Sequence, residues 1–182
     1  MSGSSDVGAM IDRLVRDVPD FPKPGVVFKD ISPLLDDHTA FTAVVQALAD
    51  AGRDGSGATV VDKVIGMEAR GFILAAPVAL ALGVGFVPVR KPGKLPSATY
   101  SVSYALEYGE ETLEMHTDAL AATERVLLVD DVLATGGTVA ATAALVAEAG
   151  AAVHGVAVLL ELSFLHGREA VGNLPLAALR TL

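Results

Sequence analysis

Two adjacent carboxylates stand where they could bind a sugar or a metal ion. Asp130 and Asp131 directly follow an apolar run, 125–129, that is typical of a central parallel strand covered by helices on both faces. The carboxyl ends of such strands face the ligand crevice of an open α/β sheet. Both acids are therefore candidates to hold sugar hydroxyls or Mg²⁺, directly or through water.

A run of small residues comes next, and its composition suits an anion. Its members carry hydroxyls or almost no side chain, so their backbone N–H groups could close on a phosphate: Ala134, Thr135, Gly136, Gly137 and Thr138. The alanine-rich segment 139–149 predicts a helix whose positive end would face the same anion. The plainer alternative is a polar turn between a strand and a helix.

Basic residues are scarce but locally concentrated. The chain has 13 Lys and Arg against 22 Asp and Glu, for a net charge of −9, yet Arg90, Lys91 and Lys94 fall close together. Their position after a predicted buried strand favours anion binding, with solvated surface charge as the alternative. Arg70 lies in an Ala-Arg-Gly turn before a predicted helix, where its guanidinium could hold a polyphosphate in a bidentate manner.

Alternating helical and apolar segments must position these residues. Helices are predicted over 6–17, 40–51, 71–82 and 139–149, and strands over 26–28, 60–65, 84–89, 126–129 and 152–160. Strands that alternate with helices indicate an α/β fold with a central, mostly parallel sheet flanked by helices. We expect residues 1–182 to form one domain, with 52–57 as a loop inside it.

Residues 98–115 show the period-two alternation of a strand pair. Even positions from 100 to 108 are apolar, the odd positions are mostly polar, and Gly109 offers a turn. This predicts a two-stranded arm that carries all three tyrosines, Tyr100, Tyr104 and Tyr108. Such arms can serve as active-site lids. The alternative is a hairpin whose tyrosines pack on the core or on a partner subunit.

Composition narrows the classes of function. Hydrophobic residues make up 52% of the chain and charged residues 19%, which excludes a disordered acidic protein. The net acidity argues against nucleic acid as a partner. With no cysteines, disulfides, cysteine-ligated zinc and thiol catalysis are excluded. We see no signal sequence and no apolar run near the ~20 residues that span a bilayer, so we expect a cytoplasmic protein without a membrane partner.

The string from the aspartates to Thr138 closely resembles the donor-binding signature of the type I phosphoribosyltransferases, which use 5-phosphoribosyl-1-pyrophosphate (PRPP). Further segments resemble adenine-specific members of that family: 21–34, 66–72, 90–96, 104–109 and 161–169. The resemblance implies the type I phosphoribosyltransferase fold. It would include a small hood, formed by 21–35 and 161–182, and a flexible β-hairpin lid over 95–115.

The resemblance also implies an activity. The chain would transfer 5-phosphoribose from PRPP to N9 of adenine, giving AMP and pyrophosphate in purine salvage. Mg²⁺ is the expected cofactor and a homodimer the expected assembly. Another purine base, such as xanthine, guanine or hypoxanthine, is the alternative acceptor. A non-catalytic regulator that senses PRPP or purines is the alternative class of protein.

By resemblance, one set of residues would hold the donor: Arg70, Lys91, Lys94, Tyr108, Asp130, Asp131, Ala134, Thr135, Gly136, Gly137 and Thr138. Asp130 and Asp131 would also hold the metal, directly or through ribose hydroxyls or water. Arg70 would contribute to catalysis by stabilising the departing pyrophosphate, and Glu107 would be the acid/base group for the purine ring.

The hood would hold the base. The backbone C=O of Val27 would accept from the adenine amine, and the backbone N–H of Lys29 would donate to a ring nitrogen. Phe28 would stack on the ring, with core packing as its alternative role, and Leu162 would close the other face. Arginine is commoner where Lys29 stands, and lysine lacks the planar guanidinium fork. Family members also carry a non-proline cis peptide, which would fall here at Glu68–Ala69.

Overall fold

The computed structural model describes residues 3–105 and 109–182, and the chain divides into two compact units, Met1–Ala47 and Leu48–Leu182. The hood residues 21–35 belong to the first unit. The second unit contains the small-residue run 134–138, here called the cradle, the basic cluster of Arg90, Lys91 and Lys94, and the predicted hairpin. The assignment of 1–182 to a single domain stays a prediction. Glu107 and Tyr108, both expected in the lid, lie outside the described residues.

Helices and one hairpin make up the first unit: α1 (Gly3–Leu14), β1 (Arg16–Pro19), β2 (Val27–Asp30), α2 (Ser32–Asp36) and all but the last two residues of α3 (His38–Ala49). The strand predicted over 26–28 is present, but it pairs antiparallel with β1 rather than joining the central sheet. The helix predicted to reach 17 ends at Leu14. Arg16 and Asp17 are instead held across the hairpin, by ion pairs of 2.6 Å to Asp30 and Lys29.

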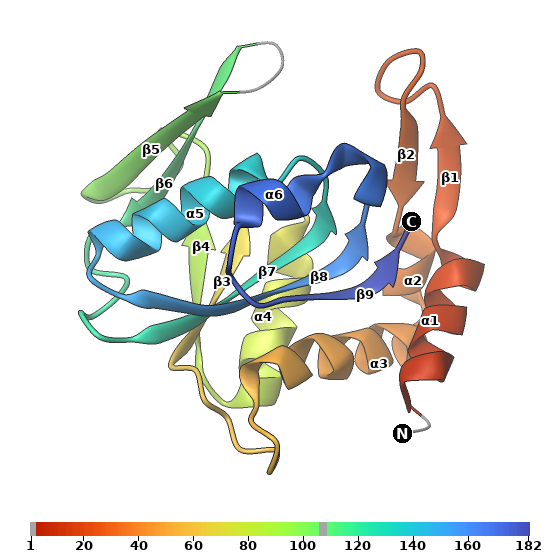
Figure 1. Cartoon of the computed structure of the whole chain (residues 1–182), viewed down its shortest axis with the longest axis horizontal. Helices are drawn as coiled ribbons and strands as arrows, with labels where there is room; N and C mark the ends of the chain where they lie inside the picture. Colours follow the sequence, from red (N-terminus) through yellow and green to blue (C-terminus); the bar gives the residue numbers. More distant parts are fainter. Residues whose placement is uncertain (1–2, 106–108) are drawn as a thin grey trace. The chain divides into compact units, whose positions relative to one another are not determined.

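A five-stranded parallel sheet forms the centre of the second unit (Figure 1), in the order β4-β3-β7-β8-β9. Its strands are β3 (Lys63–Met67), β4 (Gly85–Val89), β7 (Arg125–Leu133), β8 (Ala152–Glu161) and β9 (Leu176–Thr181). The mostly parallel sheet is confirmed, and four of its strands were predicted. β9 was not predicted, because this edge strand consists of half-buried and exposed residues and so has a weak apolar pattern.

Helices cover both faces of this sheet. α4 (Gly71–Leu82) lies on one face, whereas α5 (Gly137–Glu148) and the short α6 (Gly167–Val171) lie on the other (Figure 1). α4 has its predicted bounds, because Gly83 follows it in the left-handed conformation (φ 72°) that ends many helices. This unit also contains two 3₁₀ turns, Asp50–Gly52 and Ser163–Leu165.

The predicted hairpin is confirmed, but it is not a free-standing arm. β5 (Thr99–Ala105) and β6 (Glu110–His116) pair antiparallel. Leu113 and Met115 of β6 are fully buried, and Tyr100 and Tyr104 of β5 pack partly against the same cluster. Packing on the core, the alternative reading of this segment, therefore describes these two tyrosines.

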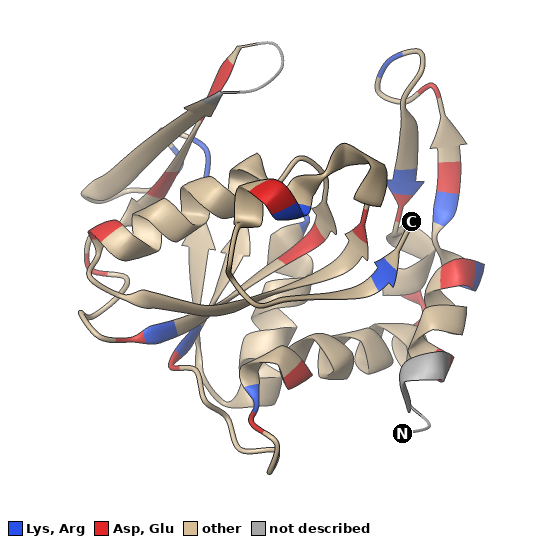
Figure 2. Cartoon of the chain, viewed as in Figure 1, with Lys and Arg blue, Asp and Glu red and all other residues tan. Residues whose placement is uncertain are grey.

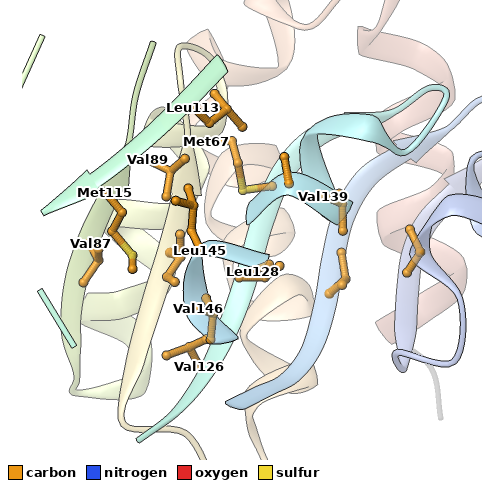
Figure 3. Packing of buried hydrophobic residues seen from close by; sticks show 14 of the residues in the cluster. Met67, Val87, Val89, Leu113, Met115, Val126, Leu128, Val139, Leu145 and Val146 are labelled. Atoms are coloured by element: carbon orange, nitrogen blue, oxygen red, sulfur yellow. The ribbon is translucent and has the colours of Figure 1, made fainter. Parts of the chain in front are cut away.

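Buried side chains from the sheet, α5 and β6 form one core. Figure 3 shows Leu128 of β7 together with Leu145 of α5, and Leu113 of β6 near Met67 and Val89. Full burial of such a side chain contributes roughly 1.5–3 kcal/mol, so the strand ends above this core are firmly placed. Across 3–105 and 109–182, no helix is long and apolar enough to cross a membrane.

Candidate active site

β7 extends beyond its neighbour β3, and both aspartates lie on this extension. β3 pairs with β7 only as far as Val129, whereas β8 follows β7 to Leu133. The strand predicted to end at 129 is therefore longer than expected, and the acids lie within it. The first residue of α4 takes the place of β3 here, because a β-carbon on Gly71 would lie 2.7 Å from Asp130 Oδ1. The carboxylates thus face the region where α4 begins.

The two aspartates form an electrostatically costly pair. Only 8% of the Asp131 side chain is exposed, and its Oδ2 lies 2.7 Å from Arg70 Nη2. Burial raises the pKa of Asp130, and the charge of Asp131 raises it further. Burial also raises the pKa of Asp131, although Arg70 opposes the rise. A hydroxyl donor or a divalent cation would stabilise the ionised pair, and the role of both acids toward a sugar or Mg²⁺ stays a prediction.

All five small residues predicted to hold an anion line one pocket. The pocket, counted with the part that is open to solvent, has a volume of about 270 Å³. Its lining residues are Asp130, Val132, Leu133, Ala134, Thr135, Gly136, Gly137, Thr138 and Val139. α5 begins at Gly137, two residues before the predicted start, and Gly136 precedes it in a left-handed conformation with φ 83°. The N-terminus of a twelve-residue helix therefore adjoins the pocket, which favours an anion there.

Tyr104 of the hairpin covers one side of this cradle. A β-carbon on Gly137 would lie 2.9 Å from the Tyr104 ring, so only glycine fits beneath it. The Tyr104 hydroxyl lies 3.1 Å from Thr138 Oγ1 and donates to Glu111 Oε2 at 2.9 Å. No site role was predicted for Tyr104. Its period-two pattern places the residue on a packed face but cannot show that this face adjoins the cradle.

Glu68 gathers the predicted basic cluster around itself. Only 8% of its side chain is exposed, and it accepts hydrogen bonds from Arg90 Nε at 3.3 Å and from the Lys91 backbone N–H at 2.9 Å. Lys94 Nζ also pairs with it. Burial alone would raise the pKa of Glu68, but the bonds to Lys94 and Lys91 hold the pKa below its ordinary value. Glu68 is therefore an ionised counter-ion for two cations.

A second carboxylate completes the basic cluster. Lys91 Nζ forms an ion pair with Glu111, so each of the three predicted cations has an acidic partner. Sequence reasoning missed both acids. The only available signal was Glu68 itself, an acidic residue directly after a buried strand and two positions before Arg70, which is an unusual place for a charge without a partner. The Glu68–Ala69 peptide is cis, as the resemblance implied.

An ion pair between a buried carboxylate and a half-exposed guanidinium joins the end of β8 to α6. Glu161, at the end of β8, accepts two hydrogen bonds from Arg168 of α6, from Nε at 2.6 Å and Nη2 at 2.7 Å. Figure 2 shows acidic and basic residues gathered at the carboxyl ends of β7 and β8 and at α6. The bidentate pair holds α6 against the end of the sheet.

The residues predicted to hold the base fall in both units. In the first unit, Val27 is 50% exposed, and the half-buried Phe28 packs edge-on against Phe21 with ring centroids 5.1 Å apart. Lys29 Nζ lies 2.6 Å from Asp17, so its ammonium is engaged within the hairpin. Leu162, in the second unit, directly follows β8. The roles of all four residues toward adenine stay predictions.

Most of the coordination of a bound metal ion would have to come from a bound substrate. Among the residues that the structure describes, no three His, Asp or Glu side chains form a group that could hold a metal ion. Mg²⁺ commonly uses one or two carboxylates together with phosphate oxygens and water. The chemistry of Asp130 and Asp131 fits this mode of binding, with most of the coordination supplied by a phosphorylated substrate.

Comparison with known proteins agrees with this geometry. Residues 34–170 match the family model of the phosphoribosyl transferase domain. An adenine phosphoribosyltransferase of Nocardioides sp. is 71% identical over 168 residues, which cover 92% of this chain and 91% of that protein.

Solved structures show the same relationship. The adenine phosphoribosyltransferase of Thermoanaerobacter pseudethanolicus has a TM-score of 0.90 at 47% identity, covering 96% of this chain and 99% of that one. The enzyme of Saccharomyces cerevisiae, complexed with an imino-altritol bisphosphate and adenine, has a TM-score of 0.90 at 35% identity over 96% of this chain and 99% of that one.

Proposed function

This chain belongs to the phosphoribosyl transferase domain family and, within it, to the adenine phosphoribosyltransferases, and we propose that it transfers 5-phosphoribose from PRPP to adenine. The products are AMP and pyrophosphate, so the enzyme is a glycosyltransferase of purine salvage. The observation that carries this proposal is the pairing of the Asp130–Asp131 carboxylates with the glycine-lined pocket directly after them. Together they suit a sugar that carries a phosphate.

The cradle is proposed to anchor the 5-phosphate of the donor. Gly136 and Gly137 leave backbone N–H groups open to an anion, and the hydroxyls of Thr135 and Thr138 can donate to it. The positive end of α5 adds a favourable field at low cost, because the helix is already in place. An anchored phosphate fixes the ribose relative to the leaving group and the base.

The aspartates are proposed to serve the ribose. During transfer the bond from C1 to the pyrophosphate oxygen breaks and the bond from C1 to N9 forms, with positive charge on the sugar ring between them. Asp130 and Asp131 can accept hydrogen bonds from the ribose hydroxyls, and their negative field stabilises that charge. Bound Mg²⁺ would supply charge neutralisation for the departing pyrophosphate, with the same two acids as its protein contacts.

The basic cluster is proposed to bind pyrophosphate. Lys91 and Lys94 follow β4, and Arg70 precedes α4, so the three cations come from the carboxyl ends of neighbouring strands. Guanidinium and ammonium groups stabilise the charge that develops on the leaving group. Arg70 would exchange some of its interaction with Asp131 for the pyrophosphate oxygens as the donor binds.

Adenine is proposed to stack on Phe28 and to be read by the backbone of Val27 and Lys29, with Leu162 on its other face. The N9 proton must leave as the new bond forms, and Glu107 is proposed to accept it. General acid/base assistance of this kind is worth about 10² to 10⁴ in rate. Glu107→Gln should therefore lose turnover while it retains donor binding. Tyr108, the next residue, is proposed to contact the donor.

One assay tests the proposal. The protein is incubated with PRPP, Mg²⁺ and one base at a time, and pyrophosphate release is measured. We expect pyrophosphate release when adenine is the base and no release with any of the other bases. Release with hypoxanthine, guanine or xanthine but not adenine would assign a different acceptor, and release with none would favour a regulator that binds PRPP or purines without catalysis.

Two expectations remain outside this assay. The homodimer is proposed by analogy with the family and can be measured by sedimentation at several protein concentrations. The cytoplasmic location stays a prediction from the sequence.

A further inference from the structure

Four side chains form a continuous series of contacts between the two phosphate-binding regions proposed above. Lys91 Nζ pairs with Glu111 Oε1, and Glu111 Oε2 accepts from the Tyr104 hydroxyl at 2.9 Å. The same hydroxyl lies 3.1 Å from Thr138 Oγ1. Tyr104 and Glu111 are direct cross-strand partners in the hairpin. The series therefore joins a cation proposed for pyrophosphate to a hydroxyl proposed for the 5-phosphate.

The number of hydrogens fixes the direction of these bonds. Pairing with Lys91 holds the pKa of Glu111 below its ordinary value, so the carboxylate is ionised at neutral pH and can only accept. Tyr104 has one hydroxyl hydrogen and gives it to Glu111. Thr138 must then donate its own hydrogen to Tyr104. The hydrogen that a phosphate would need from Thr138 is consequently engaged by the protein itself.

The opposite end of the series is engaged in the same way. Glu111 places a negative charge directly beside Lys91, which weakens the attraction of that cation for another anion. The Lys91 side chain is 51% exposed and that of Glu111 26% exposed. Ion pairs with this much solvent contact are weak, so a polyanion can replace the carboxylate.

We propose that Tyr104 and Glu111 are specificity-determining residues that favour the intact donor over its two fragments. Pyrophosphate draws Lys91 away from Glu111, and the 5-phosphate draws Thr138 away from Tyr104. Lys91 and Thr138 hold the bonded Tyr104–Glu111 pair in place from its two ends. When an anion draws Lys91 or Thr138 away, the pair is no longer fixed at that end and can move as a unit, which releases the residue at the other end. Binding of one end of the donor thus increases the affinity for the other end. Ribose 5-phosphate or pyrophosphate alone lacks this gain in affinity. The inference rests on the proposed function.

Calorimetry can measure this coupling directly. The Kd of ribose 5-phosphate is determined in Mg²⁺ buffer with and without saturating pyrophosphate. For the unmodified protein we expect pyrophosphate to lower this Kd by about three- to tenfold, the size of one exchanged hydrogen bond. By linkage, ribose 5-phosphate must lower the Kd of pyrophosphate by the same factor.

Two variants should abolish the coupling. Tyr104→Phe keeps the ring over Gly137 but removes the hydroxyl, so ribose 5-phosphate alone should bind about threefold more tightly. Glu111→Gln keeps the shape but removes the charge beside Lys91, so pyrophosphate alone should bind about threefold more tightly. In both variants the coupling should shrink to less than about twofold, because the series of contacts is interrupted.

Ser103→Ala is the matched control. Ser103 is the cross-strand partner of Thr112 in the same hairpin, with their hydroxyls 2.8 Å apart on the exposed face. This variant should retain the coupling of the unmodified protein. Absence of coupling in the unmodified protein, unchanged coupling in Tyr104→Phe, or its loss in Ser103→Ala would each overturn the inference. The proposed function fails separately, if adenine and PRPP release no pyrophosphate.

Discussion

Gly136 and Gly167 approach each other so closely that a β-carbon at either position would overlap a backbone oxygen unless the backbone shifts. On Gly136 that atom would lie 2.4 Å from the Gly167 carbonyl oxygen, and on Gly167 it would lie 2.3 Å from the Ala134 carbonyl oxygen. Both contacts are to backbone atoms, which cannot turn aside as a flexible side chain can. The turn before α6 therefore shapes the phosphate cradle from outside, although Gly167 lies 31 residues after Gly136 in the chain.

Gly167→Ala should displace the cradle without unfolding the protein. The added methyl group must push Ala134 away, and such overpacking costs about 1–3 kcal/mol of stability. A shift of about 1 Å in a substrate-positioning loop can cost up to about 10² in rate, so we expect the KM for PRPP to rise about tenfold or more. Steady-state kinetics at saturating adenine measures this.

Gly55→Ala is the control for that substitution, since nothing lies within 4 Å of a β-carbon at Gly55. It should leave the KM for PRPP unchanged. A Gly167→Ala enzyme with unaltered KM for the donor would show that the cradle does not depend on the turn before α6.

The Glu161–Arg168 pair should make stability depend on pH. The bonds from Arg168 hold the pKa of Glu161 below its ordinary value of 4.5. A carboxylate with a lowered pKa in the folded state contributes stability that is fully present above pH 4.5 and is lost as the pH falls through the lowered value. Glu161→Gln should therefore reduce the unfolding free energy at neutral pH and flatten its decline in acid.

The expected loss at neutral pH is about 1–2 kcal/mol, because Arg168 is half exposed and solvent screens the pair. Urea unfolding at pH 7, pH 4.5 and pH 3 measures both effects. Glu169→Gln on the same helix removes an exposed carboxylate and should change neither. Parallel pH profiles for Glu161→Gln and the unmodified protein would contradict the assignment.

Glu68→Gln should leave Arg90 and Lys94 without their shared counter-ion. We expect a loss of about 1–3 kcal/mol in unfolding free energy, since both cations are partly exposed. Pyrophosphate should then stabilise the variant more than it stabilises the unmodified protein, because the anion replaces the missing charge. Urea unfolding with and without pyrophosphate tests this.

Glu114→Gln provides the comparison for Glu68→Gln. The Glu114 carboxylate accepts from the backbone N–H of Gly93 at 3.0 Å, so the variant removes a charge from the same loop region without taking the acid from Arg90 or Lys94. Its stabilisation by pyrophosphate should match that of the unmodified protein. Equal stabilisation of all three proteins would argue against Glu68 as the counter-ion of an anion site.

Lys29→Met should have little effect on adenine. The Lys29 ammonium is engaged by Asp17, and the proposed contact to the base uses the backbone N–H. We expect the KM for adenine to change by less than about twofold, within the range of most surface substitutions. Phe28→Leu, which removes the proposed stacking ring, should raise that KM clearly while the KM for PRPP stays constant. A tenfold rise in Lys29→Met would show that its side chain reads the base.

Local sequence patterns predicted much of the fold and of the site. The apolar run before Asp130, the small residues after it and the glycine that begins α5 are contiguous, so their order in the sequence is also their order in space. The same holds for α4, whose apolar residues and terminal Gly83 define its bounds. Alternation over 99–105 likewise predicted β5, because packing on one face imposes a period of two.

Partners brought together only by the tertiary fold were beyond sequence reasoning. Glu68 meets Lys94 across 26 residues, and Tyr104 meets Thr138 across 34 residues. No local spacing encodes such pairs, so Lys94 and Thr138 were predicted as site residues without their partners, Glu68 and Tyr104. β1 was missed for a related reason. The sequence pattern of the helix continues through Arg16 and Asp17, but both residues form ion pairs across the hairpin, to Asp30 and Lys29, which no local pattern predicts.

The carboxylates beside the basic cluster affect how strongly small anions can inhibit the enzyme. Each cation proposed to bind pyrophosphate already has an acidic partner, either Glu68, Glu111 or Asp131. Chloride or a single inorganic phosphate can contact only one or two of these cations. At each one it must displace a carboxylate that the protein already holds in place. A chelating polyanion engages several cations at once and can replace them together. Abundant small ions should therefore inhibit this enzyme only weakly.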